Sequence, residues 1–178
     1  MSTTYVIVDV ETTGLDPQKD AIIEVAAITL RDHDILDEFA SLVNPHREIP
    51  AFITSMTGIS DAMVADAPTM FTVRSRLRPV LGDHVLVGHN VDFDLGFLNE
   101  ERLGVGNHRI DTITLAAILV PEAGRYDLES LVHYLDLPDP NGGQTHRARD
   151  DAEQTVELFL ALRERALALA MWQIEEII

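Results

Sequence analysis

The order of strand-like and helix-like segments is the feature that most constrains the fold of this chain. Three strand-like segments come first, at 5–10, 21–30 and 35–43, and a short turn predicts that the second and third form a hairpin. Two further short strands are predicted at 85–88 and 109–111. Apolar spacing and N-cap signals predict helices at 69–81, 92–103, 112–119, 127–135 and 149–169. Antiparallel strands followed by alternating strands and helices indicate an α/β domain with a mixed sheet.

The composition is typical of one globular domain. The chain has 178 residues, of which 46 % are hydrophobic and 24 % charged, and we expect a single domain over 1–178. No apolar run approaches the length of a membrane span, and the first residues do not resemble a signal peptide. The absence of cysteine excludes disulfides and thiolate metal sites, and it fits a reducing cytoplasm. The sequence therefore predicts a cytoplasmic protein without a membrane partner.

The net charge restricts how this chain could bind nucleic acid. The value of −17 comes from 30 acidic and 13 basic residues. Proteins that contact many phosphates usually present a basic surface, and this balance is the opposite. If the chain acts on nucleic acid, it must therefore do so through a small contact area and bound metal ions.

Two carboxylates stand at the end of the first predicted strand. The apolar run 5–8 leads into Asp9 and Glu11, and residues two apart on a strand point to the same face. Carboxylates that close repel each other, and each raises the pKa of the other unless a cation lies between them. A hard divalent cation with oxygen ligands fits such a pair, although surface strands also carry similar pairs by chance.

Two further segments carry acid and base groups. Asp92 and Asp94 lie where a buried strand ends and a helix begins, so both compete for a place beside the first pair. His146 and Asp151 are five residues apart, which on one helix would separate them by about 140°. We therefore expect His146 just ahead of the helix and Asp151 on it. A histidine with a pKa near neutral can accept a proton from water.

Together these segments resemble the DEDDh family of 3′–5′ exonucleases, which includes proofreading subunits of bacterial DNA polymerases. The segments 9–15, 89–94 and 146–152 are similar, in order and spacing, to the three exonuclease motifs of that family. The similarity covers nearly the whole chain and includes the linking segments 57–61 and 110–112. It implies a ribonuclease H-like fold, with a mixed five-stranded sheet flanked by helices.

The resemblance also implies a role for each matching residue. The general base would be His146, and the ligands of two Mg²⁺ or Mn²⁺ ions would be Asp9, Glu11, Asp94 and Asp151. Asp94 matches rather than Asp92, because the family places the ligand directly after a phenylalanine. The terminal nucleotide would be bound by Thr12, Thr13, Leu15, Asn90 and Phe93. Some members carry a histidine where this chain has Thr57.

We expect a metal-dependent 3′–5′ exonuclease that releases nucleoside 5′-monophosphates from single-stranded or frayed 3′ ends. The segment 11–15 is closer to DNA proofreading relatives, which favours DNA over RNA. Two alternatives stay open: an exoribonuclease that trims RNA or short oligonucleotides, and a proofreading subunit that acts mainly in complex with a DNA polymerase. The apolar end at 170–178 could pack on the domain or form a homodimer or partner surface.

Three other charged residues near the motifs have weaker signals. Asp111 is interpreted as a structural cap at a strand end rather than as a metal ligand. Arg147 and Arg149 flank His146, and they could either contact a substrate phosphate or lie solvated on the helix surface.

Overall fold

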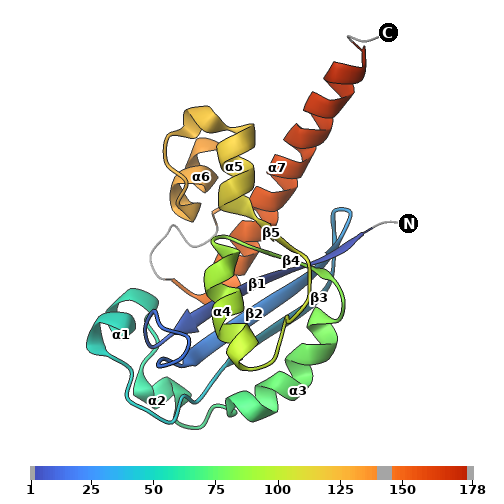
Figure 1. The fold of residues 1–178 in the computed structure, drawn as a ribbon. Coiled ribbons are helices and arrows are strands. Elements are labelled where there is room, and N and C mark those ends of the chain that lie inside the picture. Colours follow the sequence, from blue (N-terminus) through green and yellow to red (C-terminus); the bar gives the residue numbers. More distant parts are fainter. Residues whose placement is uncertain (1–2, 140–145, 176–178) are drawn as a thin grey trace.

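A mixed sheet forms the centre of the molecule. The computed structural model describes residues 3–139 and 146–175, of which 170–175 through the backbone alone. The strand order is β3-β2-β1-β4-β5, with bounds β1 (Thr4–Thr12), β2 (Ile22–Arg31), β3 (Asp34–Leu42), β4 (Val85–Gly88) and β5 (Arg109–Asp111). β2 pairs antiparallel with β1 and β3, whereas β4 runs parallel to β1 and β5 (Figure 1). The predicted mixed five-stranded sheet is confirmed.

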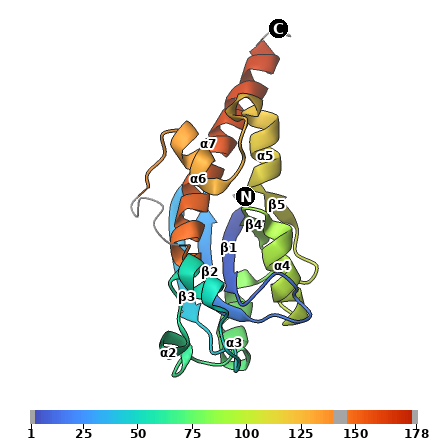
Figure 2. The same ribbon diagram turned by 90° about the vertical axis from the view of Figure 1, so that its left-hand side faces the viewer.

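Helices cover both faces of this sheet (Figures 1 and 2). They are α1 (Ala51–Thr57), α2 (Asp61–Val64), α3 (Met70–Leu81), α4 (Val91–Glu100), α5 (Thr112–Leu119), the 3₁₀ turn η1 (Pro121–Ala123), α6 (Leu128–Tyr134) and α7 (Ala148–Glu175). The helix predicted over 92–103 ends earlier, at Glu100, and Arg102 then leads the chain away with a left-handed φ of 56°. α7 continues to Glu175, beyond its predicted end at 169.

Alternation along β1 divides the core between the two faces of the sheet. One row of side chains packs with apolar residues of α3 and α4, and it consists of Val6, Val8 and Val10. Ile7 points to the other face, where it packs with α7 through Ala152, Val156 and Phe159. Since residues two apart share a face, Asp9 and Glu11 continue the row of Ile7 on the side that α7 covers.

α7 joins two packing regions. Its first turns cover the sheet, and farther along Leu158 and Leu162 pack with Ala116 of α5 and Leu131 of α6. Beyond these contacts the helix projects away from the sheet (Figure 1). Across the described ranges, no helix combines the length and apolar character that a membrane span requires. The side chains of 170–178, predicted to form a packing or interaction tail, lie outside the described residues.

We expect Leu98→Ala to destabilise the fold far more than Leu167→Ala. Both are helical leucines, but Leu98 is 0 % exposed and Leu167 is 55 % exposed. Truncating a fully buried leucine costs about 2–5 kcal/mol because it leaves a cavity, whereas a surface change usually stays within about 0.5 kcal/mol. Urea unfolding followed by circular dichroism measures both free energies of unfolding. Equal losses would contradict this placement of the core.

Candidate active site

Three carboxylates meet where β1 ends and α7 begins. Asp9 and Glu11 project from the same face of β1, and Asp151 lies in the first turn of α7. Each contributes one carboxylate oxygen to a group in which all oxygens lie within 4.8 Å of one another. The alternation predicted for β1 and the helical position predicted for Asp151 are therefore confirmed.

Crowding and loss of solvent raise the pKa of each of these carboxyls. For Asp9, burial is the largest cause, and the charges of Asp94, Asp151 and Glu11 raise the pKa further above its ordinary value. Burial and the neighbouring carboxylates raise the pKa of Glu11 to about 8. Burial also raises the pKa of Asp151, while His146 opposes this shift. Without a cation, the site therefore disfavours the fully ionised cluster.

Asp94 adjoins the cluster from α4. The ladder between β4 and β1 covers Tyr5–Ile7, and beyond it the Val10 N–H donates to Asp94 Oδ1 at 3.0 Å. Asp94 is 3 % exposed, and burial raises its pKa although this hydrogen bond opposes the shift. Asp92 instead points to solvent and pairs with Arg109 at 2.6 Å. The structure thus places Asp94, and not Asp92, beside the carboxylates of β1.

A tight turn between β4 and α4 sets the direction of Asp94. Asn90 adopts a φ of 65°, in the left-handed region that asparagine tolerates better than most residues. Its N–H donates to Asp111 Oδ1 at 3.1 Å. The same oxygen accepts from the Ile113 N–H at 2.9 Å, as the N-cap of α5. Asp111 is therefore a structural cap, as the sequence indicated.

His146 lies two residues before α7, as predicted, and it faces Asp151. Its Nδ1 is 3.3 Å from Asp151 Oδ2, and its backbone N–H donates to Met56 O at 3.3 Å. The side chain is 66 % exposed. Together with Asp9, Asn90 and Asp151, it lines a cleft of about 410 Å³. The exposed imidazole is therefore accessible from this cleft.

The loop after β1 uses Thr12 and Thr13 to hold its own shape. Thr12 Oγ1 donates to Gly14 O at 2.6 Å, and Thr13 Oγ1 accepts from the Ala21 N–H at 3.0 Å. A Cβ at Gly14 would lie 2.4 Å from Asp20 Oδ2, so a larger residue would have to displace the Asp20 carboxylate. The two threonines, predicted to bind the terminal nucleotide, are buried and engaged within the loop.

The other predicted nucleotide contacts have different surroundings. Leu15 is 82 % exposed, and Asn90 lines the cleft. Phe93 is half-buried, and its ring centre lies 5.2 Å from that of Phe97. Thr57, where some relatives have histidine, is 0 % exposed, and its hydroxyl donates to the Ile53 carbonyl of the same helix at 3.0 Å. Leu15 and Asn90 are therefore the best placed of these residues to contact a ligand.

Glu24 is a neighbour of the site that the motifs do not include. It is 4 % exposed on β2, opposite Glu11 in the strand ladder, and it accepts hydrogen bonds from Arg147 at 2.6 and 2.9 Å. A glutamate inside the otherwise apolar segment 22–30 is the sequence signal that could have revealed it, because buried charges rarely occur without a partner. Arg147 is thus bound to a protein carboxylate.

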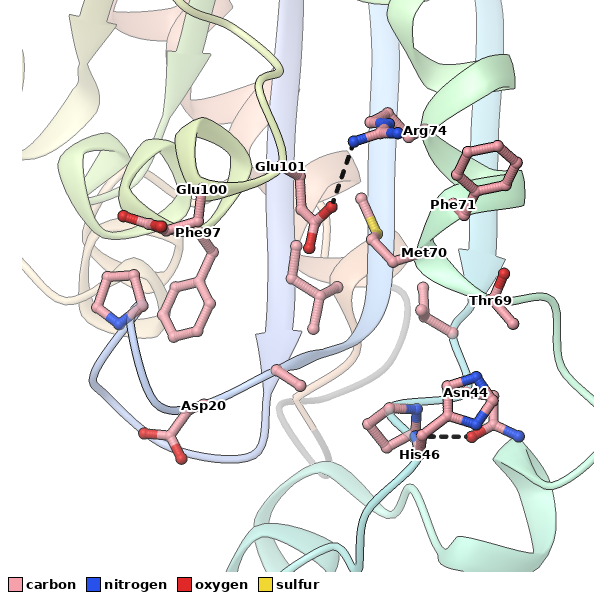
Figure 3. Close-up of a pocket in the computed structure, with 15 residues that line it drawn as sticks. Asp20, Asn44, His46, Thr69, Met70, Phe71, Arg74, Phe97, Glu100 and Glu101 are labelled. Carbon is pink, nitrogen blue, oxygen red and sulfur yellow. Dashed lines mark hydrogen bonds and ion pairs between the residues drawn. The ribbon is translucent and has the colours of Figure 1, made fainter.

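A second hollow, of about 490 Å³, lies on the α3 and α4 side of the sheet (Figure 3). Arg74 and Glu101 face each other there, with 4.0 Å between Nη1 and Oε2. Met70 and Phe97 contribute apolar surface. The residues that line this hollow include none of those predicted to carry the chemistry, so it is not the candidate active site.

Comparison with known protein families assigns the chain. The family model RNase_T, described as an exonuclease, matches residues 6–159. The chain belongs to this exonuclease family. The match includes all three motif segments, and it reaches from β1 into α7.

The exonuclease domain is similar to part of a long bacterial polymerase. It is 41 % identical over 169 residues to DNA polymerase III PolC-type of Bacillus subtilis, which covers 92 % of this chain and 12 % of that protein. The PolC-type polymerase of Bacillus cereus is 40 % identical over 164 residues, covering 89 % of this chain and 11 % of that protein. The chain therefore spans only 11–12 % of the length of these relatives.

Solved structures share the fold. Exonuclease X in complex with 5′-overhanging duplex DNA gives a TM-score of 0.76 at 30 % identity, covering 90 % of this chain and 91 % of that one. The zinc-bound complex of E. coli ExoI with single-stranded DNA gives a TM-score of 0.79 at 17 % identity, covering 97 % of this chain and 43 % of that one. At this identity the similarity is one of fold alone. With the mixed sheet, these matches confirm the predicted ribonuclease H-like fold.

In the absence of metal, the exonuclease domain should lose stability as the pH rises from about 4.5 to 8. The folded-state pKa of Glu11 is about 8 against an ordinary 4.5, so the native state retains a proton that the unfolded chain releases. The stabilisation that comes from this retained proton is fully present below pH 4.5, and it is lost as the pH rises through about 8. Each kcal/mol lost lowers Tm by roughly 2–4 °C in a domain of this size.

Thermal unfolding in EDTA at a series of pH values measures this effect. Glu11→Gln should make Tm less dependent on pH, because the amide cannot ionise. The pKa values of Asp9, Asp94 and Asp151 are also raised. The Tm of Glu11→Gln should therefore still fall with rising pH, but less than that of the wild type. An unchanged pH dependence in Glu11→Gln would contradict the raised pKa of Glu11.

Proposed function

We propose that residues 1–178 form a metal-dependent 3′–5′ exonuclease domain, which releases nucleoside 5′-monophosphates from single-stranded or frayed 3′ ends. One observation carries this proposal: oxygens of Asp9, Glu11 and Asp151 meet within 4.8 Å, and His146 lies 3.3 Å from Asp151. Acidic groups alone are common on protein surfaces. An acidic cluster joined to an exposed base inside a cleft supports hydrolysis.

The donor atoms of the cluster suit hard divalent cations. Mg²⁺ and Mn²⁺ prefer oxygen ligands, and carboxylate oxygens are offered by Asp9, Glu11, Asp94 and Asp151. Burial, followed by nearby carboxylates, raises the pKa values of all four groups, so a bound cation would favour their ionised forms. These residues would therefore hold two Mg²⁺ or Mn²⁺ ions. Bound ions supply activation of water and stabilise negative charge on the phosphate and the leaving oxygen.

In this proposal, His146 would act as the general base. Its Nδ1 faces Asp151 at 3.3 Å, which leaves Nε2 to accept a proton from the attacking water. Asp151 would orient the ring and stabilise the imidazolium that forms. The water oxygen bonds to phosphorus, and the bond from phosphorus to the 3′-oxygen of the preceding nucleotide breaks. Because the His146 side chain is 66 % exposed, its proton can then pass to solvent.

DNA is the favoured substrate. The PolC-type relatives are named as DNA polymerases, and Exonuclease X has been solved with 5′-overhanging duplex DNA. The segment 11–15 agrees with this preference. The exposed Leu15 and the cleft residue Asn90 would contact the terminal nucleotide. RNA trimming is the alternative, because the choice of sugar depends on contacts made in the bound complex.

A polymerase context is a second proposal, which the relatives and the charge support. In the PolC-type relatives, the matching part belongs to a much longer polymerase chain. The net charge is −17, and two arginines near the motifs, Arg109 and Arg147, are paired with Asp92 and Glu24. A partner that contributes phosphate contacts would compensate for this small cationic surface. The exonuclease domain would then act mainly together with a DNA polymerase.

Asp94→Asn should abolish nuclease activity, whereas Asp92→Asn should leave it nearly unchanged. Both replace a carboxylate in the same turn of α4, but only Asp94 lies beside β1. Loss of a proposed metal ligand should slow cleavage by more than about 100-fold. Mutating residues that only hydrogen-bond to metal ligands already lowers metal affinity or activity by roughly 10–100-fold. The assay follows a 5′-labelled single-stranded DNA oligomer with Mn²⁺, with and without EDTA. Shortening from the 3′ end establishes the direction.

Full activity of folded Asp94→Asn would refute the assignment of this residue. The same oligomer made as RNA tests the substrate, and faster cleavage of RNA would favour the alternative enzyme. If folded wild-type protein cleaves neither oligomer, the assay is repeated with a PolC-type polymerase present. Activity that appears only then would support the polymerase proposal.

Mn²⁺ or Mg²⁺ should raise the Tm of the wild-type protein. A cation that binds the native cluster but not the unfolded chain stabilises the fold, by about 2.7 kcal/mol at a free concentration of 100 times Kd. Asp9→Asn should reduce this rise, and Asp92→Asn, which changes an exposed carboxylate, should keep it. Differential scanning fluorimetry over millimolar metal measures the shift. An unchanged transition in the wild type would count against a metal site.

A further inference from the structure

Glu24 lies next to the proposed metal site without a ligand role of its own. It is the cross-strand neighbour of Glu11, so the two side chains stand side by side on the sheet face that α7 covers. Glu24 is 4 % exposed. Another buried carboxylate at this position requires a counter-charge, because like charges directly opposite each other are destabilising. Arg147 supplies that charge.

Three donors from the segment that opens α7 bind the Glu24 carboxylate. Arg147 Nη2 donates to Oε1 at 2.6 Å, Arg147 Nε donates to Oε2 at 2.9 Å, and the Ala148 N–H donates to Oε2 at 3.0 Å. The first two form a bidentate, charge-assisted pair. The third satisfies one of the N–H groups that a helix leaves unpaired at its start. Both oxygens of Glu24 are thus occupied within the protein.

These contacts hold the segment that carries the proposed base. His146 directly precedes Arg147, and the Asp151 N–H donates to Arg147 O at 2.9 Å within the first turn of α7. The contact of the His146 N–H with Met56 O is longer, at 3.3 Å. A shift of Arg147 relative to β2 would therefore change the positions of His146 and Asp151 relative to Glu11.

We propose that Glu24 and Arg147 are positioning residues of the active site. Arg147 clamps the start of α7 onto β2, so that His146 and Asp151 face the carboxylates of β1. This inference rests on the proposed exonuclease function, and it adds two residues that do not touch the reacting atoms. Arg147 has this role instead of the phosphate contact that its sequence position allowed. The planar guanidinium suits the role, since it binds both oxygens of one carboxylate at once.

Arg149, in the first turn of α7, offers a matched control two residues after Arg147. It pairs with Glu38 at 3.2 Å and with Glu153 at 3.1 Å, and its side chain is 57 % exposed. Exposed ion pairs of this kind contribute little to stability. Arg149→Met therefore removes an ion-paired arginine from the start of α7 without changing the contacts of Glu24.

The experiment compares Arg147→Met, Glu24→Gln and Arg149→Met with the wild type. Steady-state cleavage of the DNA oligomer separates kcat from KM, calorimetric titration with Mn²⁺ alone gives metal affinity, and ¹H–¹⁵N spectra follow the His146 ring. In the first two variants, kcat should fall at least about 10-fold with KM changed less than roughly 3-fold, because misplacement of reacting groups acts on the chemical step. Their Mn²⁺ affinity should fall and the His146 signals should shift. Arg149→Met should match the wild type.

Wild-type kcat, Mn²⁺ affinity and His146 signals in folded Arg147→Met would overturn the proposal. If the first two variants do not fold, Arg147→Lys decides, because lysine keeps the charge but loses the planar fork. Normal Tm with reduced kcat in Arg147→Lys supports positioning, and normal kcat overturns it. If the wild type cleaves no oligomer either alone or with a PolC-type polymerase, the exonuclease proposal fails, whereas the Mn²⁺ and His146 measurements still decide the positioning role.

Discussion

Repulsion among closely spaced, partly or fully buried carboxylates is the constraint on which the rest of the site depends. Asp9 and Glu11 are brought together by the alternation of β1, and the packing of α7 adds Asp151. Burial and then neighbouring carboxylates raise the pKa values of Asp9 and Glu11, so the protein alone holds this cluster ionised at the expense of stability. The same crowding would favour a bound divalent cation, because a cation would relieve the repulsion. The crowded carboxylates of the free protein and the proposed metal site are therefore two aspects of one arrangement.

Rigid packing on both faces of the sheet maintains this arrangement. The valines of β1 pack on α3 and α4, while Ile7 packs on α7. The carboxylates thus extend from a strand whose preceding residues are buried on both sides. α4 adds Asp94 through the hydrogen bond from Val10, and the start of α7 adds His146 and Asp151. Small displacements of either helix would change distances within the cluster, so contacts such as that of Glu24 with Arg147 would matter for the proposed chemistry.

The acidic balance of the chain agrees with this picture of the site. Several arginines near the motifs are engaged by carboxylates of the protein, as in the pairs of Arg109 with Asp92 and Arg149 with Glu38. Few of these cations remain to bind phosphates, so bound metal and a partner would have to provide much of the attraction for nucleic acid. The length of the PolC-type relatives is consistent with such a partner, since this domain corresponds to 11–12 % of those chains.

Sequence alone determined the features that depend on local backbone geometry. The period of two along β1 placed Asp9 and Glu11 on one face, and the five-residue spacing placed His146 ahead of the helix that carries Asp151. Tertiary structure decided between Asp94 and Asp92, because the docking of α4 determines which side chain meets β1. It also turned the hydroxyls of Thr12 and Thr13 into the loop, and it joined Arg147 to Glu24 across 123 positions of the chain. Periodicity follows from the backbone of one segment, whereas such partners exist only once distant segments have packed together.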